Sequence, residues 1–178
     1  MKLPLYFVAI AIAGQALCQS VTPAPDTSDL PQIAVGVGPS WNRGDAHATS
    51  VNVSIGIRLG DTPGYSWSEI STPVARVPAG ADPLPSTITT GGAYRIAKSA
   101  SGAVSIWGIG QAGFNASAAS FSLALTGSAA VSFRIPKTKD LYLFLYGKLA
   151  KPQRGTDGAL VGGILQPGFN LEYGFGGK

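Results

Sequence analysis

The sequence is poor in charge, and this shortage excludes several common classes of protein. Only 12% of its 178 residues are Asp, Glu, Lys or Arg, about half the share found in an ordinary globular domain. There is a single Cys, so no disulfide can form within one chain. There is also a single Met, whereas Gly numbers 24 and Pro 13. This composition disfavours a helical bundle and favours short strands joined by turns.

The formal net charge of +4 raises nucleic acid as a partner class. The thirteen basic residues are scattered, and the one tight pair, Lys137 with Lys139, falls in a predicted turn. A nucleic-acid surface usually needs a basic patch or stripe. We therefore predict no nucleic-acid partner.

No apolar run in the sequence is long enough for a transmembrane helix, which needs ~20 residues. The run at 3–13 follows Lys2 and precedes Ala16-Leu17-Cys18, the pattern of a secretory signal peptide. We predict that residues 1–18 are a signal peptide cleaved after Cys18; acylation of Cys18 in a lipoprotein is the alternative. Residues 19–31 are rich in Pro and are predicted to form a linker.

Two segments alternate apolar and polar residues with a period of two, which is typical of β-strands. In 50–59 every second residue is Val, Ile or Leu, and in 121–135 the alternation runs for about fifteen residues, whereas soluble strands usually have ~5–6. Strands of this length suit a tilted membrane crossing. Because an open sheet edge cannot be satisfied in lipid, a membrane-spanning structure built from them must be a closed barrel.

Less regular alternation predicts six further strands, at 33–41, 65–77, 87–96, 103–114, 141–149 and 166–175. Phase is lost around Glu69–Ile70 and Ile106–Trp107, which indicates either β-bulges or a wrong assignment there. Short polar turns near 61–64, 98–102 and 136–140 alternate with four longer loops. The predicted fold class is therefore all-β, an antiparallel up-and-down transmembrane barrel of about eight strands over residues 32–178, with both ends on the short-turn side.

The last predicted strand carries the segment Gln-Pro-Gly-Phe-Asn-Leu-Glu-Tyr at 166–173. With the strand and turn pattern of 32–175, it resembles the small eight-stranded bacterial outer-membrane barrels of the OmpA/OmpX type. The resemblance implies that Gly168, Leu171 and Tyr173 belong to a C-terminal signal read by the barrel-assembly machinery. It also implies a location in the bacterial outer membrane, with outer-membrane lipid as the surrounding partner.

Charged residues inside the strands fall on the phase opposite the apolar residues, so in a barrel they point inward. They are predicted to form a lumen charge network that Glu69 can join, and its members are Arg58, Arg95, Arg134, Lys148 and Glu172. Because eight strands enclose only enough space for their own side chains, we expect a plugged lumen. Aromatic residues near strand ends are interpreted as girdles at the membrane surfaces; they are Trp41, Tyr65, Trp67, Tyr94, Phe133 and Tyr173.

The sequence offers little for catalysis. Its single histidine, His47, lies beside Asp45 in the first predicted loop, without a second histidine, metal-like spacing or a Gly-x-Ser-x-Gly elbow. We predict a non-enzymatic protein without a cofactor or metal, whose external loops serve envelope stability, adhesion or binding of a surface ligand. The alternatives are a secreted soluble β-barrel or sandwich that binds a small ligand, a lipid-modifying enzyme centred on His47, and a narrow channel.

Overall fold

The computed structural model describes residues 21–23, 29–42, 48–74, 86–116, 121–138, 140–150, 153–154, 160–161 and 165–176. The regular secondary structure in these ranges is β-strand throughout. Three short strands are β1 (Val21–Pro23), β9 (Gln153–Arg154) and β10 (Leu160–Val161). The eight long strands are β2 (Ile33–Asn42), β3 (Ala48–Arg58), β4 (Gly64–Pro73), β5 (Ser86–Ser99), β6 (Val104–Ala116), β7 (Phe121–Arg134), β8 (Leu141–Ala150) and β11 (Leu165–Phe175).

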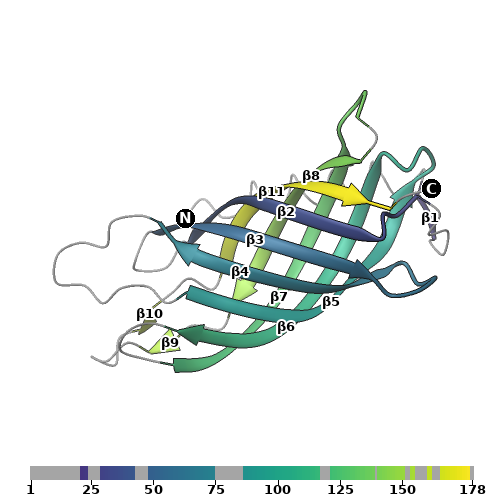
Figure 1. Ribbon diagram of the computed structural model, residues 1–178. Helices are drawn as coiled ribbons and strands as arrows, with labels where there is room; N and C mark the ends of the chain where they lie inside the picture. Colours follow the sequence, from purple (N-terminus) through teal and green to yellow (C-terminus); the bar gives the residue numbers. More distant parts are fainter. Residues whose placement is uncertain are drawn as a thin grey trace.

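The eight long strands form one closed wall (Figure 1). Each pairs antiparallel with the next along the chain, and β11 closes the circle by pairing with β2, with Leu171 opposite Val37. The arrowhead of β11 and the short β1 lie at the same end of the barrel in Figure 1. The predicted fold class, an all-β antiparallel up-and-down barrel of eight strands, is confirmed.

The strands that were predicted to lose phase are regular. In β4 the inward residues are Tyr65, Trp67 and Glu69, and in β6 Trp107 and Ile109 are likewise buried on alternate positions. The proposed bulge at Glu69–Ile70 is therefore wrong, and the one proposed at Ile106–Trp107 lies instead on the partner strand β5, opposite these two residues. The physical reason is that the interior faces of these two strands are partly apolar, so hydrophobicity does not alternate although the side chains do.

A register shift does occur in β5, between Arg95 and Ala97. In a regular strand, residues three apart point to opposite faces, and one extra residue cancels that difference. Arg95 pairs with Trp107 of β6 and Lys98 with Ser105, and both of these partners are buried in the lumen. The bulge therefore lets Arg95 and Lys98 point to the same side of the wall.

Three short turns join β3 to β4, β5 to β6 and β7 to β8. Among the described residues of these turns, Gly60, Gly102 and Lys137 have a left-handed backbone, with φ of 59°, 67° and 67°. The predicted signal peptide, His47 and parts of the four long loops lie outside the described residues.

Gly38 lies at the seam where β2 meets β11, and only glycine fits there. A Cβ atom at this position would be 1.8 Å from the carbonyl oxygen of Phe169 and 2.8 Å from Cα of Asn170. Both are backbone atoms, so the added methyl group could be accommodated only if the two strands moved apart. The next residue, Pro39, has no N–H and can donate no backbone hydrogen bond across a strand pair. Few backbone hydrogen bonds are therefore available near Gly38 to offset a separation of the two strands.

We expect Gly38→Ala to reduce the fraction of barrel that closes, with a cost of about 1–3 kcal/mol from overpacking. Heat-modifiable migration in detergent gels, in which the closed barrel and the unfolded chain separate, measures this fraction. Gly127→Ala is the matched control, because a Cβ at Gly127 meets no atom within 4 Å. Equal folding of the two variants would contradict the close approach at the seam.

Candidate functional site

The lumen and the outer wall of the barrel have opposite characters. Large hydrophobic side chains from all eight wall strands are exposed on the outside. Examples are Val37, Val53, Ile57, Ile70, Ile88, Phe114, Leu125, Leu145 and Leu171. The buried interior instead holds charged and polar groups together with a compact group of aromatic rings. The buried charged and polar side chains of the described chain therefore lie inside the wall.

Aromatic side chains cross the lumen between strands that are not neighbours. The rings of Trp67 on β4 and Phe144 on β8 stack with centroids 5.7 Å apart, and Trp107 on β6 lies 6.1 Å from Phe144. The ring of Tyr65 lies 5.8 Å from that of Trp107, whose Nε1 donates to Ser132 Oγ at 2.9 Å. These four rings are almost fully buried, and they fill part of the lumen.

This arrangement corrects the predicted aromatic girdle. Tyr65 and Trp67, each 3% exposed, belong to the lumen rather than to a membrane surface. The other four predicted members are exposed on the outer wall; they are Trp41, Tyr94, Phe133 and Tyr173. Strand-end position alone does not distinguish the two faces, because adjacent residues of a strand point in opposite directions.

A buried ion pair joins Lys148 on β8 to Glu69 on β4. These two strands lie opposite each other, since three wall strands separate them in either direction around the barrel. Both side chains are at most 6% exposed, and the Lys148 Nζ also lies 5.8 Å from the centre of the Tyr146 ring. The pair therefore ties opposite walls together across the lumen.

Two amide side chains extend this polar layer. Asn52 Nδ2 donates to the Tyr146 hydroxyl at 2.6 Å, and Asn170 Nδ2 donates to Ser54 Oγ at 3.2 Å. Both bonds join strands that are not sequence neighbours, and both amides are at most 1% exposed. Asn170 Oδ1 has no hydrogen-bond partner among the described residues, and the buried bonds that these amides do make favour one arrangement of the lumen over others.

Glu172 on β11 is buried in the lumen, and its Oε1 accepts no hydrogen bond from the residues that the structure describes. It lines a cavity of about 30 Å³ near the short-turn end. Among the other lining residues are Arg95, Tyr142, Ser105, Trp107 and Leu30. A space of this size, lined by apolar side chains together with a few polar ones, is large enough for one or two water molecules.

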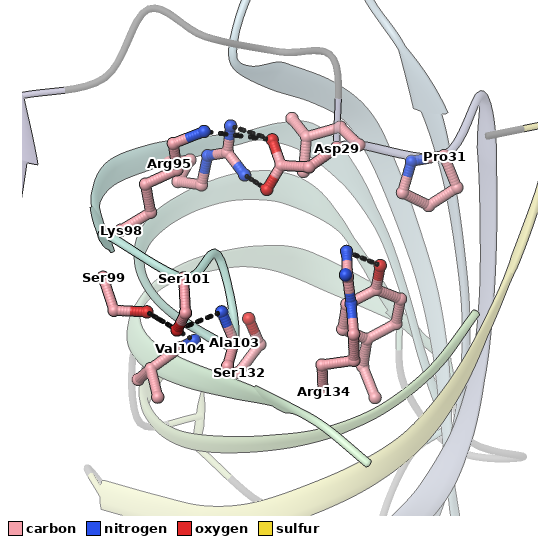
Figure 2. A network of polar contacts seen from close by, with 12 residues as sticks. Asp29, Pro31, Arg95, Lys98, Ser99, Ser101, Ala103, Val104, Ser132 and Arg134 are labelled. Atoms are coloured by element: carbon pink, nitrogen blue, oxygen red, sulfur yellow. Dashed lines mark hydrogen bonds and ion pairs between the residues drawn. The ribbon is translucent and has the colours of Figure 1, made fainter. Parts of the chain in front are cut away.

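A second ionic cluster lies at that end of the barrel. Arg95 Nη1 and Nη2 donate to the two Asp29 oxygens at 2.8 and 3.0 Å, and Lys98 Nζ lies 3.4 Å from Asp29 Oδ1. Figure 2 shows the Asp29 carboxylate facing both cationic side chains, which lie side by side. A two-pronged contact between guanidinium and carboxylate is among the strongest ionic contacts in proteins.

The environment of Asp29 keeps it ionised. Burial on its own would raise the pKa of Asp29, but the hydrogen bonds and charge of Arg95 and the charge of Lys98 outweigh it, so the pKa is lowered. A carboxyl whose pKa falls on folding stabilises the structure fully above its unfolded value of ~3.9, and loses this effect only as the pH drops through the lower folded value. The cluster is therefore intact at neutral and mildly acidic pH.

The five residues of the predicted charge network all face the lumen, but the described contacts tie four of them to different partners and give Glu172 neither a hydrogen bond nor an ion pair. Lys148 pairs with Glu69 and Arg95 with Asp29. Arg58 Nη1 donates to the Leu30 carbonyl at 2.9 Å, and Arg134 Nη2 donates to the Tyr142 hydroxyl at 3.1 Å.

The three residues predicted for the barrel-assembly signal divide between the two faces of β11. Leu171 and Tyr173 are exposed on the outer wall, while Gly168 is buried. A Cβ at Gly168 would lie 2.5 Å from the Tyr146 hydroxyl. Gly168 thus makes room for Tyr146, whose hydroxyl oxygen accepts the hydrogen bond of Asn52.

Comparison with known proteins bears on the fold. No family model and no curated protein matches the sequence. The structure is similar to a solved one described as "De novo design of transmembrane beta-barrels", with a TM-score of 0.53, over 81% of this chain and 95% of that one, at 13% sequence identity. The fold is that of a transmembrane β-barrel. This fold suggests a membrane location for the chain.

The described residues of the barrel include no cluster of three or more His, Cys, Asp or Glu side chains that could hold a metal. In the same part of the chain, no helix is long and apolar enough to cross a membrane.

Two features of the lumen were missed by the sequence analysis. The aromatic cluster could have been found from phase, because Tyr65 and Trp67 share the phase of Glu69, and Trp107 shares that of Gln111. Asp29 could not have been found in this way. It lies in the segment predicted as a linker, and no periodicity connects it with Arg95, which is 66 positions away.

Proposed function

We propose that the chain is a non-enzymatic outer-membrane barrel, exported with a cleaved signal peptide, whose closed lumen gives a rigid anchor to its long loops. The loops serve envelope stability, adhesion or contact with a surface ligand. The barrel-assembly machinery inserts the chain by reading the segment around Gly168, Leu171 and Tyr173.

The observation that carries this proposal is the inverted distribution of side chains. Exposed valine, isoleucine, leucine and phenylalanine residues surround the wall, whereas Glu69, Lys148, Asn52 and Asn170 are buried. A soluble barrel would place its apolar side chains inside and its charges outside. An apolar outer band around a polar interior is the pattern of barrels in lipid, so it favours the membrane proposal over the secreted soluble alternative.

Fractionation of cells that express the full chain tests the location. We expect the protein in the outer-membrane fraction, to be extracted only with detergent and to show heat-modifiable migration. Recovery in the soluble periplasmic fraction without detergent would contradict the proposal and favour the secreted alternative.

Contacts across the lumen support a barrel that does not conduct. The Trp67–Phe144 stack and the Glu69–Lys148 pair each span the interior between opposite walls. Planar bilayers containing the purified protein should show no steady conductance above that of protein-free bilayers. Reproducible single-channel steps would favour the channel alternative, and lipid hydrolysis that is lost in His47→Ala would favour the enzyme.

A further inference from the structure

The segment just before the barrel folds into the barrel's own mouth. Residues 29–31 precede β2, yet Leu30 is only 5% exposed and Pro31 is also buried. A Cβ added at Gly174 of β11 would lie 2.5 Å from Pro31 Cγ. The last three residues of the predicted linker are therefore packed against the wall, and we call residues 29–31 the strap.

Three neighbouring wall strands hold the strap by polar contacts. Arg58 on β3 donates to the Leu30 carbonyl at 2.9 Å, and the Tyr65 hydroxyl on β4 donates to the Pro31 carbonyl at 2.9 Å. On β5, Arg95 and Lys98 bind the Asp29 carboxylate. The strap is thus held by the buried Leu30 side chain, by hydrogen bonds to its backbone carbonyls and by ion pairs to Asp29.

The β5 bulge is what brings both cations to Asp29. Without the extra residue between Arg95 and Ala97, Lys98 would point to the outer wall. The chain ahead of the strap also returns to this strand, because β1 pairs with Ala97–Ser99 of β5. Both the strap and β1 therefore contact β5 at this end of the barrel.

Beneath the strap lies the small cavity that contains the Glu172 carboxyl. Asp29, Leu30 and Pro31 form one side of it, and Trp67, Trp107 and Phe144 lie among the other lining residues. We propose that the strap is a plug that closes the short-turn end of the lumen, and that the ion cluster of Asp29 with Arg95 and Lys98 holds it shut. When the strap leaves, water reaches Glu172 and the aromatic cluster from that end. This inference does not depend on what the long loops bind.

Quenching of tryptophan fluorescence by acrylamide, which is soluble in water, tests the plug. In the Trp41→Phe background, the remaining tryptophans are Trp67 and Trp107, and both line the cavity below the strap. We expect Asp29→Asn in this background to raise the quenching constant of the purified protein in detergent micelles by about twofold or more, as local opening admits the quencher.

The matched control is Asp61→Asn, which removes an exposed carboxylate from the β3–β4 turn at the same end of the barrel. It should leave quenching unchanged. Leu30→Ala, which removes the apolar anchor and keeps the charge, should raise quenching in the same direction as Asp29→Asn. Heat-modifiable migration establishes that each barrel is closed. If either Asp29→Asn or Leu30→Ala does not form a closed barrel, the plug is tested with the other of these two variants.

Unchanged quenching in a closed Asp29→Asn or Leu30→Ala barrel would overturn the plug. An equal rise in Asp61→Asn would also overturn it, because the effect would then come from surface charge. If fractionation placed the protein outside the membrane, the quenching results would still stand. The plug and the proposed function are therefore tested separately.

Discussion

Lys148→Met should destabilise the barrel by about 3–5 kcal/mol, because it leaves the buried Glu69 carboxylate without its counter-charge. The cost is large since the partner comes from the opposite wall and both side chains are nearly excluded from solvent. Urea unfolding of the purified protein in detergent micelles, followed by heat-modifiable migration, measures it.

The double variant Glu69→Leu/Lys148→Met separates loss of the pair from loss of packing. Replacing both partners of a buried ion pair with apolar side chains is often neutral or stabilising, so this variant should recover most of the stability that Lys148→Met loses. If the two variants were equally unstable, side-chain volume rather than the unpaired charge would be the cause, and the ion pair would have no special role across the lumen.

Val53→Arg should impair membrane insertion by about 2–4 kcal/mol, the cost of a lipid-facing Arg near the bilayer midplane. Val53 is 49% exposed on the outer wall, and its neighbours across the two adjacent strands, Val37 and Ile70, are exposed with it. The folded fraction in lipid vesicles, measured against urea, reports the change.

The control for this prediction is Val53→Leu, which keeps an apolar side chain of similar size on the same face. Leu125→Arg, on β7, should repeat the loss on another part of the wall. Insertion of both Arg variants at the level of the native protein would contradict a lipid-facing wall and would instead favour an outer surface in contact with water.

Local patterns in the sequence were sufficient to predict the wall. The predicted strand at 50–59 corresponds to β3 and that at 121–135 to β7, each within two residues at either end. The period of two is a property of a single strand, and in these segments the outward face is uniformly apolar, so no tertiary information was needed. Short turns were equally readable, because polar turn residues, Pro and Gly mark them in the sequence, as at 61–64 and 98–102.

Prediction failed where the interior carries apolar side chains. In β4 and β6 the buried residues include Trp67, Trp107 and Ile109, so a hydrophobicity pattern cannot tell the lumen from the lipid. Their place inside depends on closure, which brings β4, β6 and β8 within reach of one another around a narrow interior.

The partners of the inward charges were beyond any sequence pattern. That Arg58, Arg95, Arg134, Lys148 and Glu172 point inward follows from phase alone, but which of them meet depends on the number of strands and their stagger around the barrel. Closure sets Lys148 opposite Glu69 and the β5 bulge turns Lys98 toward Asp29. Strand direction and facing are local and were readable in the chain; contacts across the lumen arise only when the first and last wall strands join.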